Sequence, residues 1–91
     1  MATTLPFARR PSFQSLLASV YKLGSVLPQW EMDPEVSEDG TPYVSVTLPG
    51  EAWATYGAHW DGSGWVVVHS ETLEAVSRSP DVVLALQSAL A

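Results

Sequence analysis

The two histidines of this sequence are candidate ligands for a metal ion. His59 and His69 lie near Asp61, and a zinc site would need these three side chains to converge. The alternating pattern around them places the two histidines on opposite faces of a strand pair. The sequence has no cysteine, which removes thiolate ligands and thiol nucleophiles. We therefore expect no metal site and no disulfide, and the lack of cysteine fits a reducing cytoplasm.

The Gly62-Ser63-Gly64 tripeptide resembles a turn that presents a catalytic serine or cradles a phosphate. Both of those turns join a strand to a helix, whereas strand-like segments lie on both sides of this tripeptide. It is therefore predicted to be a hairpin loop. Two of the ten carboxylates could converge for acid–base chemistry, but no spacing singles out a pair. We expect a protein that is not an enzyme and that has no cofactor.

A row of acidic residues is the sharpest feature of the sequence. Glu31, Asp33 and Glu35 alternate with apolar residues, so they share one face of a strand, with successive side chains about 6.7 Å apart. Glu38 and Asp39 follow at the tip of the predicted hairpin. A phosphate backbone is also a row of like charges at separations of the same order. One hypothesis is therefore that the row binds a basic protein surface by mimicking nucleic acid.

The same row has a simpler explanation. Polar residues line the solvent side of most half-buried hairpins, and charges on an edge strand prevent unwanted strand pairing. A surface that serves solubility alone normally mixes both signs of charge. This strand carries acidic residues only, and both interpretations stay open from the sequence.

Four aromatic residues form a second candidate contact surface, namely Tyr43, Tyr56, Trp60 and Trp65. Tyrosine and tryptophan are enriched in protein interfaces, so an exposed aromatic face would indicate a partner-binding or dimer surface. The alternative is that these rings form the core beneath the helices. Periodicity does not decide between the two, because it does not say which side of the second hairpin meets the helices.

The charges of the chain are segregated along its length. Residues 1–28 carry three of the four basic residues and no carboxylate. Residues 29–91 carry all ten carboxylates and Arg78, a formal charge of −9. The acidic part should repel nucleic acid and membrane surfaces and attract basic proteins. Folding of Arg9 and Arg10 back onto the acidic hairpin would neutralise it internally.

The elements that position these residues begin with a helix. Apolar residues recur at three- and four-residue spacing and stop at Gly24 and Pro28, which predicts a helix over about residues 12–24. Residues 1–10 are expected to form a flexible arm, and residues 11–91 a single α+β domain. The alternative for the basic, serine-containing start is a transit peptide.

A hairpin follows the helix. Apolar and polar residues alternate on both sides of Glu38-Asp39-Gly40, and a three-residue loop with glycine in its third position pairs Val36 with Pro42. In that register all the apolar side chains of the hairpin share one face. Pro34 cannot donate a hydrogen bond to a neighbouring strand, so the first strand is predicted to lie at the edge of the sheet.

The second half of the chain predicts another hairpin and two more helices. Strands over about 53–60 and 65–69 flank the glycine-containing loop. Ser70 is expected to cap a second helix, and Ser79-Pro80-Asp81 is typical of the start of a third. The fold class is therefore α+β: a two-layer sandwich of a four-stranded antiparallel meander with one N-terminal and two C-terminal helices on one face.

These features together favour a non-enzymatic, acidic protein-binding module. The expected partner is a basic protein surface, in particular that of a nucleic-acid-binding protein, and neither nucleic acid itself nor a membrane. Inhibitors of bacterial defence systems of the anti-CRISPR type and antitoxins are classes with these properties. The alternative is a structural or adaptor domain that forms a homodimer through the uncovered face of its sheet.

Overall fold

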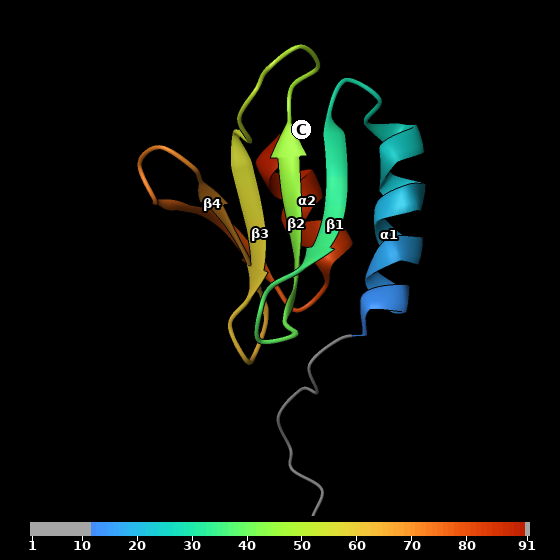
Figure 1. The fold of residues 1–91 in the computed structure, drawn as a ribbon, viewed down its shortest axis with the longest axis vertical. Helices are drawn as coiled ribbons and strands as arrows, with labels where there is room; N and C mark the ends of the chain where they lie inside the picture. The colour runs from blue at the N-terminus through green and yellow to red at the C-terminus, as the bar shows by residue number, and fades with distance from the viewer. Residues whose placement is uncertain (1–11, 91) are drawn as a thin grey trace, which may run out of the picture.

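The computed structural model describes residues 12–90, which form two helices and a five-stranded antiparallel sheet. The strands follow the order β1-β2-β3-β4-β5 across the sheet, so each strand pairs with its neighbours in the sequence (Figure 1). The elements are α1 (Phe13–Val26), β1 (Glu31–Val36), β2 (Pro42–Thr47), β3 (Tyr56–Trp60), β4 (Trp65–His69), β5 (Ala75–Ser79) and α2 (Val82–Leu90). The predicted flexible arm, residues 1–10, lies outside the described residues.

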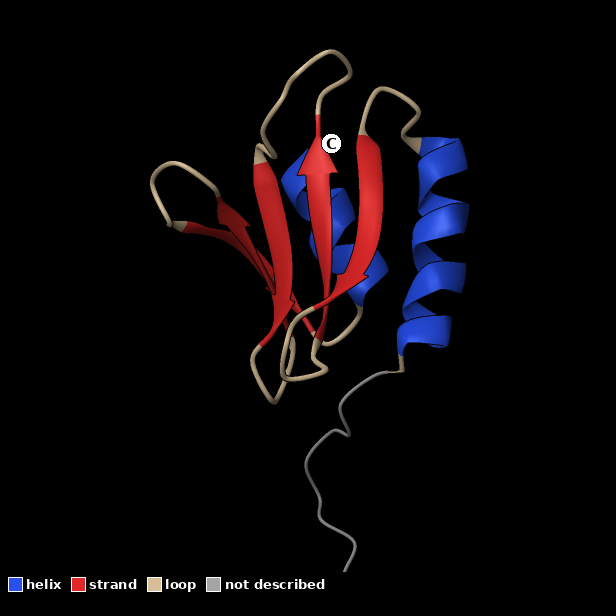
Figure 2. Ribbon diagram, viewed as in Figure 1, coloured by secondary structure: helices blue, strands red, loops and turns tan. Residues whose placement is uncertain are grey.

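Both helices cover the same face of the sheet, which makes two layers (Figure 2). α1 contacts β1 and α2, whereas α2 contacts β3, β4 and β5. The predicted α+β class and the antiparallel meander are confirmed. The count of four strands and three helices is wrong, because the segment after β4 forms a fifth strand instead of a helix.

The boundaries of α1 follow from its sequence. The Ser12 hydroxyl accepts a hydrogen bond from the Ser15 backbone N–H at 3.1 Å and caps the N-terminus. Leu16, Val20 and Leu23, at the helical spacing of three and four residues, are the buried positions of the helix. The helix is thus anchored to the sheet by one apolar stripe, close to where the sequence predicts it.

The first hairpin has the predicted register. Val36 lies opposite Pro42 and Pro34 opposite Val44, and β1 is an edge strand. Gly40 has φ of 85°, the left-handed conformation that the three-residue loop requires. Val44 and Val46 of β2 are fully buried under the helices, while the intervening side chains lie on the opposite face of the sheet, which we call the outer face.

In the second hairpin Trp60 lies opposite Trp65. The Asp61 carboxylate closes the loop by accepting hydrogen bonds from the backbone N–H groups of Ser63 and Gly64, both at 2.9 Å. Gly64 is buried, and a Cβ there would lie 3.3 Å from the backbone oxygen of Ser79, so the loop packs closely on the end of β5.

The predicted second helix exists only as a single turn. The Leu73 N–H donates to the His69 backbone oxygen at 2.8 Å, as in a helix, but Leu73 has φ of 63°, which ends the helical path. The chain then reverses, and the His69 N–H donates to the Glu74 oxygen at 2.9 Å. β5 therefore pairs with β4, which gives the valine-rich β4 a strand on each side and leaves no bare edge at that strand.

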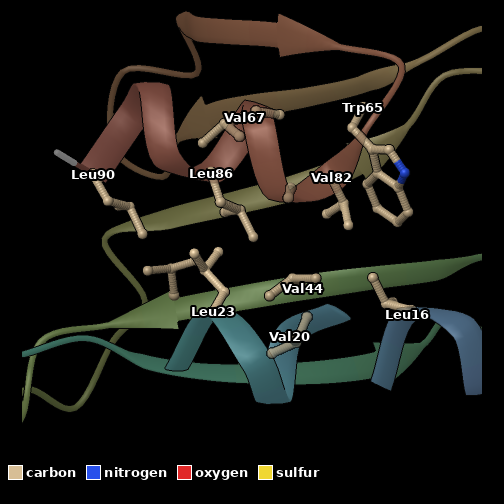
Figure 3. Packing of buried hydrophobic residues seen from close by; sticks show 12 residues of the cluster. Leu16, Val20, Leu23, Val44, Trp65, Val67, Val82, Leu86 and Leu90 are labelled. Carbon is tan, nitrogen blue, oxygen red and sulfur yellow. The ribbon is translucent and has the colours of Figure 1, made fainter. Parts of the chain in front are cut away.

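The core lies between the sheet and the two helices (Figure 3). Leu23 of α1 and Leu86 of α2 both reach into it, and Val44 and Val67 meet them from the sheet. No polar or charged side chain among residues 12–90 is buried. Every polar or charged side chain of the described residues therefore lies at least partly at the surface.

Candidate functional site: the acidic edge strand

The hairpin places the three acidic residues of β1 together on the outer face. Glu31, Asp33 and Glu35 are all exposed, whereas Met32 and Pro34 between them are half-buried and point toward the helix layer. Six residue pairs tie β1 to β2, so the carboxylates stand on a fixed backbone. We call Glu31, Asp33 and Glu35 the acidic row. The row that the sequence predicts is thus present as a geometric feature.

Glu35 is held in place by its neighbours on β2. Its carboxylate accepts hydrogen bonds from the Ser45 hydroxyl at 2.9 Å and the Tyr43 hydroxyl at 3.3 Å. Desolvation of the phenol and, after it, the Glu35 carboxylate raise the pKa of Tyr43 above its ordinary value of 10.0. Within residues 12–90 the carboxylates of Glu31 and Asp33 have no hydrogen-bond or ion-pair partner. Two members of the row are therefore not neutralised by any side chain of the described residues.

The two acidic residues at the hairpin tip differ from each other. The Asp39 carboxylate accepts hydrogen bonds from the Ser37 hydroxyl and, at 3.0 Å, from the Thr41 backbone N–H. Asp39 therefore closes the turn. Glu38 is exposed. The tip extends the acidic surface of the row, but Asp39 also has this structural role.

Arg78 does not neutralise the acidic row. It lies on β5, at the opposite edge of the sheet from β1, and forms an ion pair with Asp61. Its guanidinium also donates to the Ser63 hydroxyl at 3.2 Å. The backbone N–H groups of Ser63 and Gly64, and to a smaller extent Arg78, hold the pKa of Asp61 below its ordinary value of 3.8. Arg78 thus stabilises the loop between β3 and β4.

The proposed neutralisation of the hairpin by Arg9 and Arg10 concerns residues outside the described part of the chain. It stays a hypothesis.

The four aromatic residues of the second predicted surface do not form one exposed face. Trp65 is only 3% exposed and belongs to the core, and Tyr56 and Trp60 are half-buried against it. Tyr43 alone lies on the outer face, as the neighbour of Glu35. The alternative interpretation, in which these rings form the core beneath the helices, therefore describes Tyr56, Trp60 and Trp65.

The outer face also carries His59, which lies next to the acidic row although the sequence alone does not connect the two. The His59 ring stacks on the Tyr43 ring, with centroids 6.0 Å apart and planes 12° apart. Glu35, Tyr43 and His59 are consecutive cross-strand neighbours on β1, β2 and β3. This arrangement depends on the register between β2 and β3. The sequence does not predict that register, because the connection between the two strands is long and has no short turn motif.

The two histidines lie on opposite faces of the sheet, as their spacing predicts. His59 is on the outer face. His69 lies on the helix-covered face, where its ring packs edge-on against the Tyr56 ring with centroids 5.4 Å apart. Among residues 12–90 no group of three histidine or acidic side chains is placed to hold a metal ion. No helix in that part of the chain has the length and apolar character needed to cross a bilayer.

Comparisons with protein-family models, with curated proteins and with solved structures find no match to this chain. No residue role is therefore taken from a relative.

Proposed function

We propose that this chain is a non-enzymatic, acidic protein-binding module that inhibits a basic, nucleic-acid-binding protein. The observation that supports the proposal is the acidic row, which presents carboxylates at strand spacing on a fixed hairpin. The exposed carboxylates of Glu31 and Asp33 need no rearrangement to meet lysine or arginine side chains. The row would occupy the groove in which the partner holds a phosphate backbone.

Charge complementarity of this kind acts mainly on association rate and partner choice. The net charge of −6 would attract a basic partner from a distance and repel nucleic acid. Inhibitors of bacterial defence systems of the anti-CRISPR type and antitoxins are the classes that this physical picture fits best. Such an inhibitor would act in the cytoplasm.

Affinity capture from cell extract with matched variants tests the proposal. Neutralising the row with Glu31→Gln, Asp33→Asn and Glu35→Gln removes three charges from the outer face of β1. The control variant removes three charges elsewhere, with Glu51→Gln, Glu71→Gln and Glu74→Gln, all exposed in the wild type. Both variants have the same net charge, so only the position of the charges differs.

We expect the wild type and the control variant to capture the same basic, nucleic-acid-binding protein, and the row variant to lose it. The captured complex should also form more slowly as the salt concentration rises, because salt screens exposed charges. Equal capture by both variants would remove the row from the binding surface and refute the proposal.

A homodimer that uses the outer face is the alternative function. It is favoured by Val66 and Val68, which are half-buried on the outer face of β4 although no described element covers them. A second copy packed on this face would bury them completely. Light scattering distinguishes the two functions, because the dimer predicts twice the chain mass at micromolar concentration and the inhibitor does not require it.

A further inference from the structure

The free edge of β1 exposes backbone groups that can be identified from the hydrogen-bond pattern. The Ser37 N–H donates to the Thr41 oxygen at 2.9 Å, so Ser37 and Thr41 form a hydrogen-bonded pair of the β1–β2 ladder. Such pairs alternate along antiparallel strands. The acidic row therefore turns its backbone groups toward β2, and Met32, Pro34 and Val36 turn theirs toward the free edge. Met32 and Val36 offer an N–H and a C=O each, and Pro34 offers only its C=O.

An apolar groove of about 470 Å³ lies along the same edge, between α1 and β1. Leu17, Tyr21 and Gly24 line it from the helix, and Met32 and Pro34 line it from the strand. α1 runs alongside β1 at the margin of the sheet (Figures 1 and 2). Leu17 is 43% exposed and Tyr21 85% exposed, so this second apolar stripe of α1 is not used by the core.

The two sides of this edge have opposite chemistry. Toward the helix layer lies the apolar groove, and toward the outer face lies the acidic row. Side chains of a strand added to β1 would alternate between these two environments. The edge therefore fits an extended segment in which apolar and basic residues alternate.

We propose that β1 binds such a segment of a partner protein by β-strand addition. The backbone of the segment pairs with Met32 and Val36, its apolar side chains enter the groove, and its lysine or arginine side chains lie beside the acidic row. The proposal rests on the proposed function, and it specifies that the basic partner binds through an extended segment in which apolar and basic residues alternate.

The other occupants of this edge fit less well. Two copies paired antiparallel through β1 would set one acidic row against the other, which like-charge repulsion opposes.

A strand from this chain itself is the other possible occupant. α1 begins at the end of the sheet where β1 ends (Figure 1). A strand of this chain leading directly into α1 would therefore run parallel to β1, and the crossover through α1 would be left-handed. About 98% of such crossovers are right-handed.

Nuclear magnetic resonance titration of the full chain with short peptides tests the inference. The probe is a capped peptide of six residues, the length of β1, in which lysine and valine alternate. A second peptide has the same composition with the three lysines before the three valines. We expect the alternating peptide to bind more tightly and to shift the amide signals of Met32 and Val36.

Val36→Pro removes an N–H from the free edge without changing any charge or any hydrogen bond to β2. Val36→Ala is its matched control, because it shortens the same side chain and keeps the N–H. We expect Val36→Pro to weaken binding of the alternating peptide by about fivefold relative to Val36→Ala, the effect of one hydrogen bond. Tyr21→Gln, at an exposed position of the groove, should also weaken it.

Three results would overturn the inference. The first is equal binding of the two peptides, and the second is equal binding of the alternating peptide by the two Val36 variants. The third is no binding of either peptide by the full chain, the result expected if residues 1–11 or a second copy occupied the edge. The proposed function has a separate criterion. If both peptides bind equally and neutralisation of the acidic row abolishes binding, the row still attracts basic partners and only strand addition fails. If neutralisation has no effect, the row itself has no binding role.

Discussion

Replacing Leu73 with glycine should stabilise the protein, an unusual result for the removal of a large apolar side chain. Leu73 has φ of 63° and is 76% exposed, so it adopts a left-handed conformation and buries little surface. That conformation costs a residue with a Cβ about 1–2 kcal/mol. Glycine avoids this cost, but its greater freedom in the unfolded chain offsets about 0.5–1 kcal/mol. The net expectation is a gain between about 0 and 1.5 kcal/mol, with a midpoint of about 0.8 kcal/mol.

The sign of this effect distinguishes a hairpin from the helix that the sequence predicts after Ser70. Glycine inside a helix costs about 1 kcal/mol. Leu84→Gly provides the control, because Leu84 is an exposed leucine inside α2. We expect Leu84→Gly to lower the free energy of unfolding by at least about 1 kcal/mol.

Urea denaturation, followed by tryptophan fluorescence, to which the buried Trp65 contributes, measures both changes. A gain of about 1 kcal/mol would also raise the melting temperature by about 4–8 °C in a domain of this size. If Leu73→Gly instead destabilises the protein as much as Leu84→Gly does, the left-handed turn and the strand β5 that follows it are refuted.

Three further predictions concern the outer face and the core. Gly57→Ala places a Cβ 2.9 Å from the His59 Nε2, so the imidazole ring should move away from Tyr43. The ring-current shift that Tyr43 causes in the His59 ring protons should then disappear from the proton spectrum. The free energy of unfolding should fall by less than about 1 kcal/mol. Because folding raises the pKa of Tyr43, the folded state binds the phenol proton more tightly than the unfolded state does. This difference stabilises the fold below about pH 10, and the stabilisation is lost as the pH rises through the raised pKa. Glu35→Gln should lower that pKa, which carbon-13 titration of the ring can measure. Leu86→Ala, at a position with no exposed surface, should cost about 2–5 kcal/mol in thermal or urea unfolding.

The first hairpin was predictable because local rules determine it completely. Strict alternation, a glycine in the third loop position and Pro34 at the edge all specify one register, and a slip by one residue would reverse every side chain. The acidic row follows from the same register. Its exposure and its fixed spacing could therefore be predicted from the sequence, whereas its partner could not.

The fifth strand was missed because its connection begins with helical signals. Ser70 and the acidic residues after it are typical of a helix start, and the chain does make one helical turn there. The competing signal was Val66-Val67-Val68, a run typical of a strand paired on both sides. Pairing β5 with β4 satisfies the backbone of that run, and this tertiary requirement is stronger than the local preference.

The position of the aromatic residues depended on a register that the sequence leaves open. The second hairpin specifies that Tyr56, Trp60 and Trp65 share a face, and they do. Which face meets the helices is set by the pairing of β2 with β3, where Val44 lies opposite Ala58. The connection between those strands has no short turn motif, so its pairing cannot be derived from the local sequence.

Pro34 limits what can grow from the exposed side of this sheet. An amyloid ladder requires the backbone groups along each edge of a strand to bond to the chain stacked on that edge. The proline ring removes the amide proton at the midpoint of β1, between the two residues whose protons face the free edge, so each copy stacked there would lose one backbone hydrogen bond. Fibril growth from this edge is thus less favourable than from an edge strand of the same length without proline.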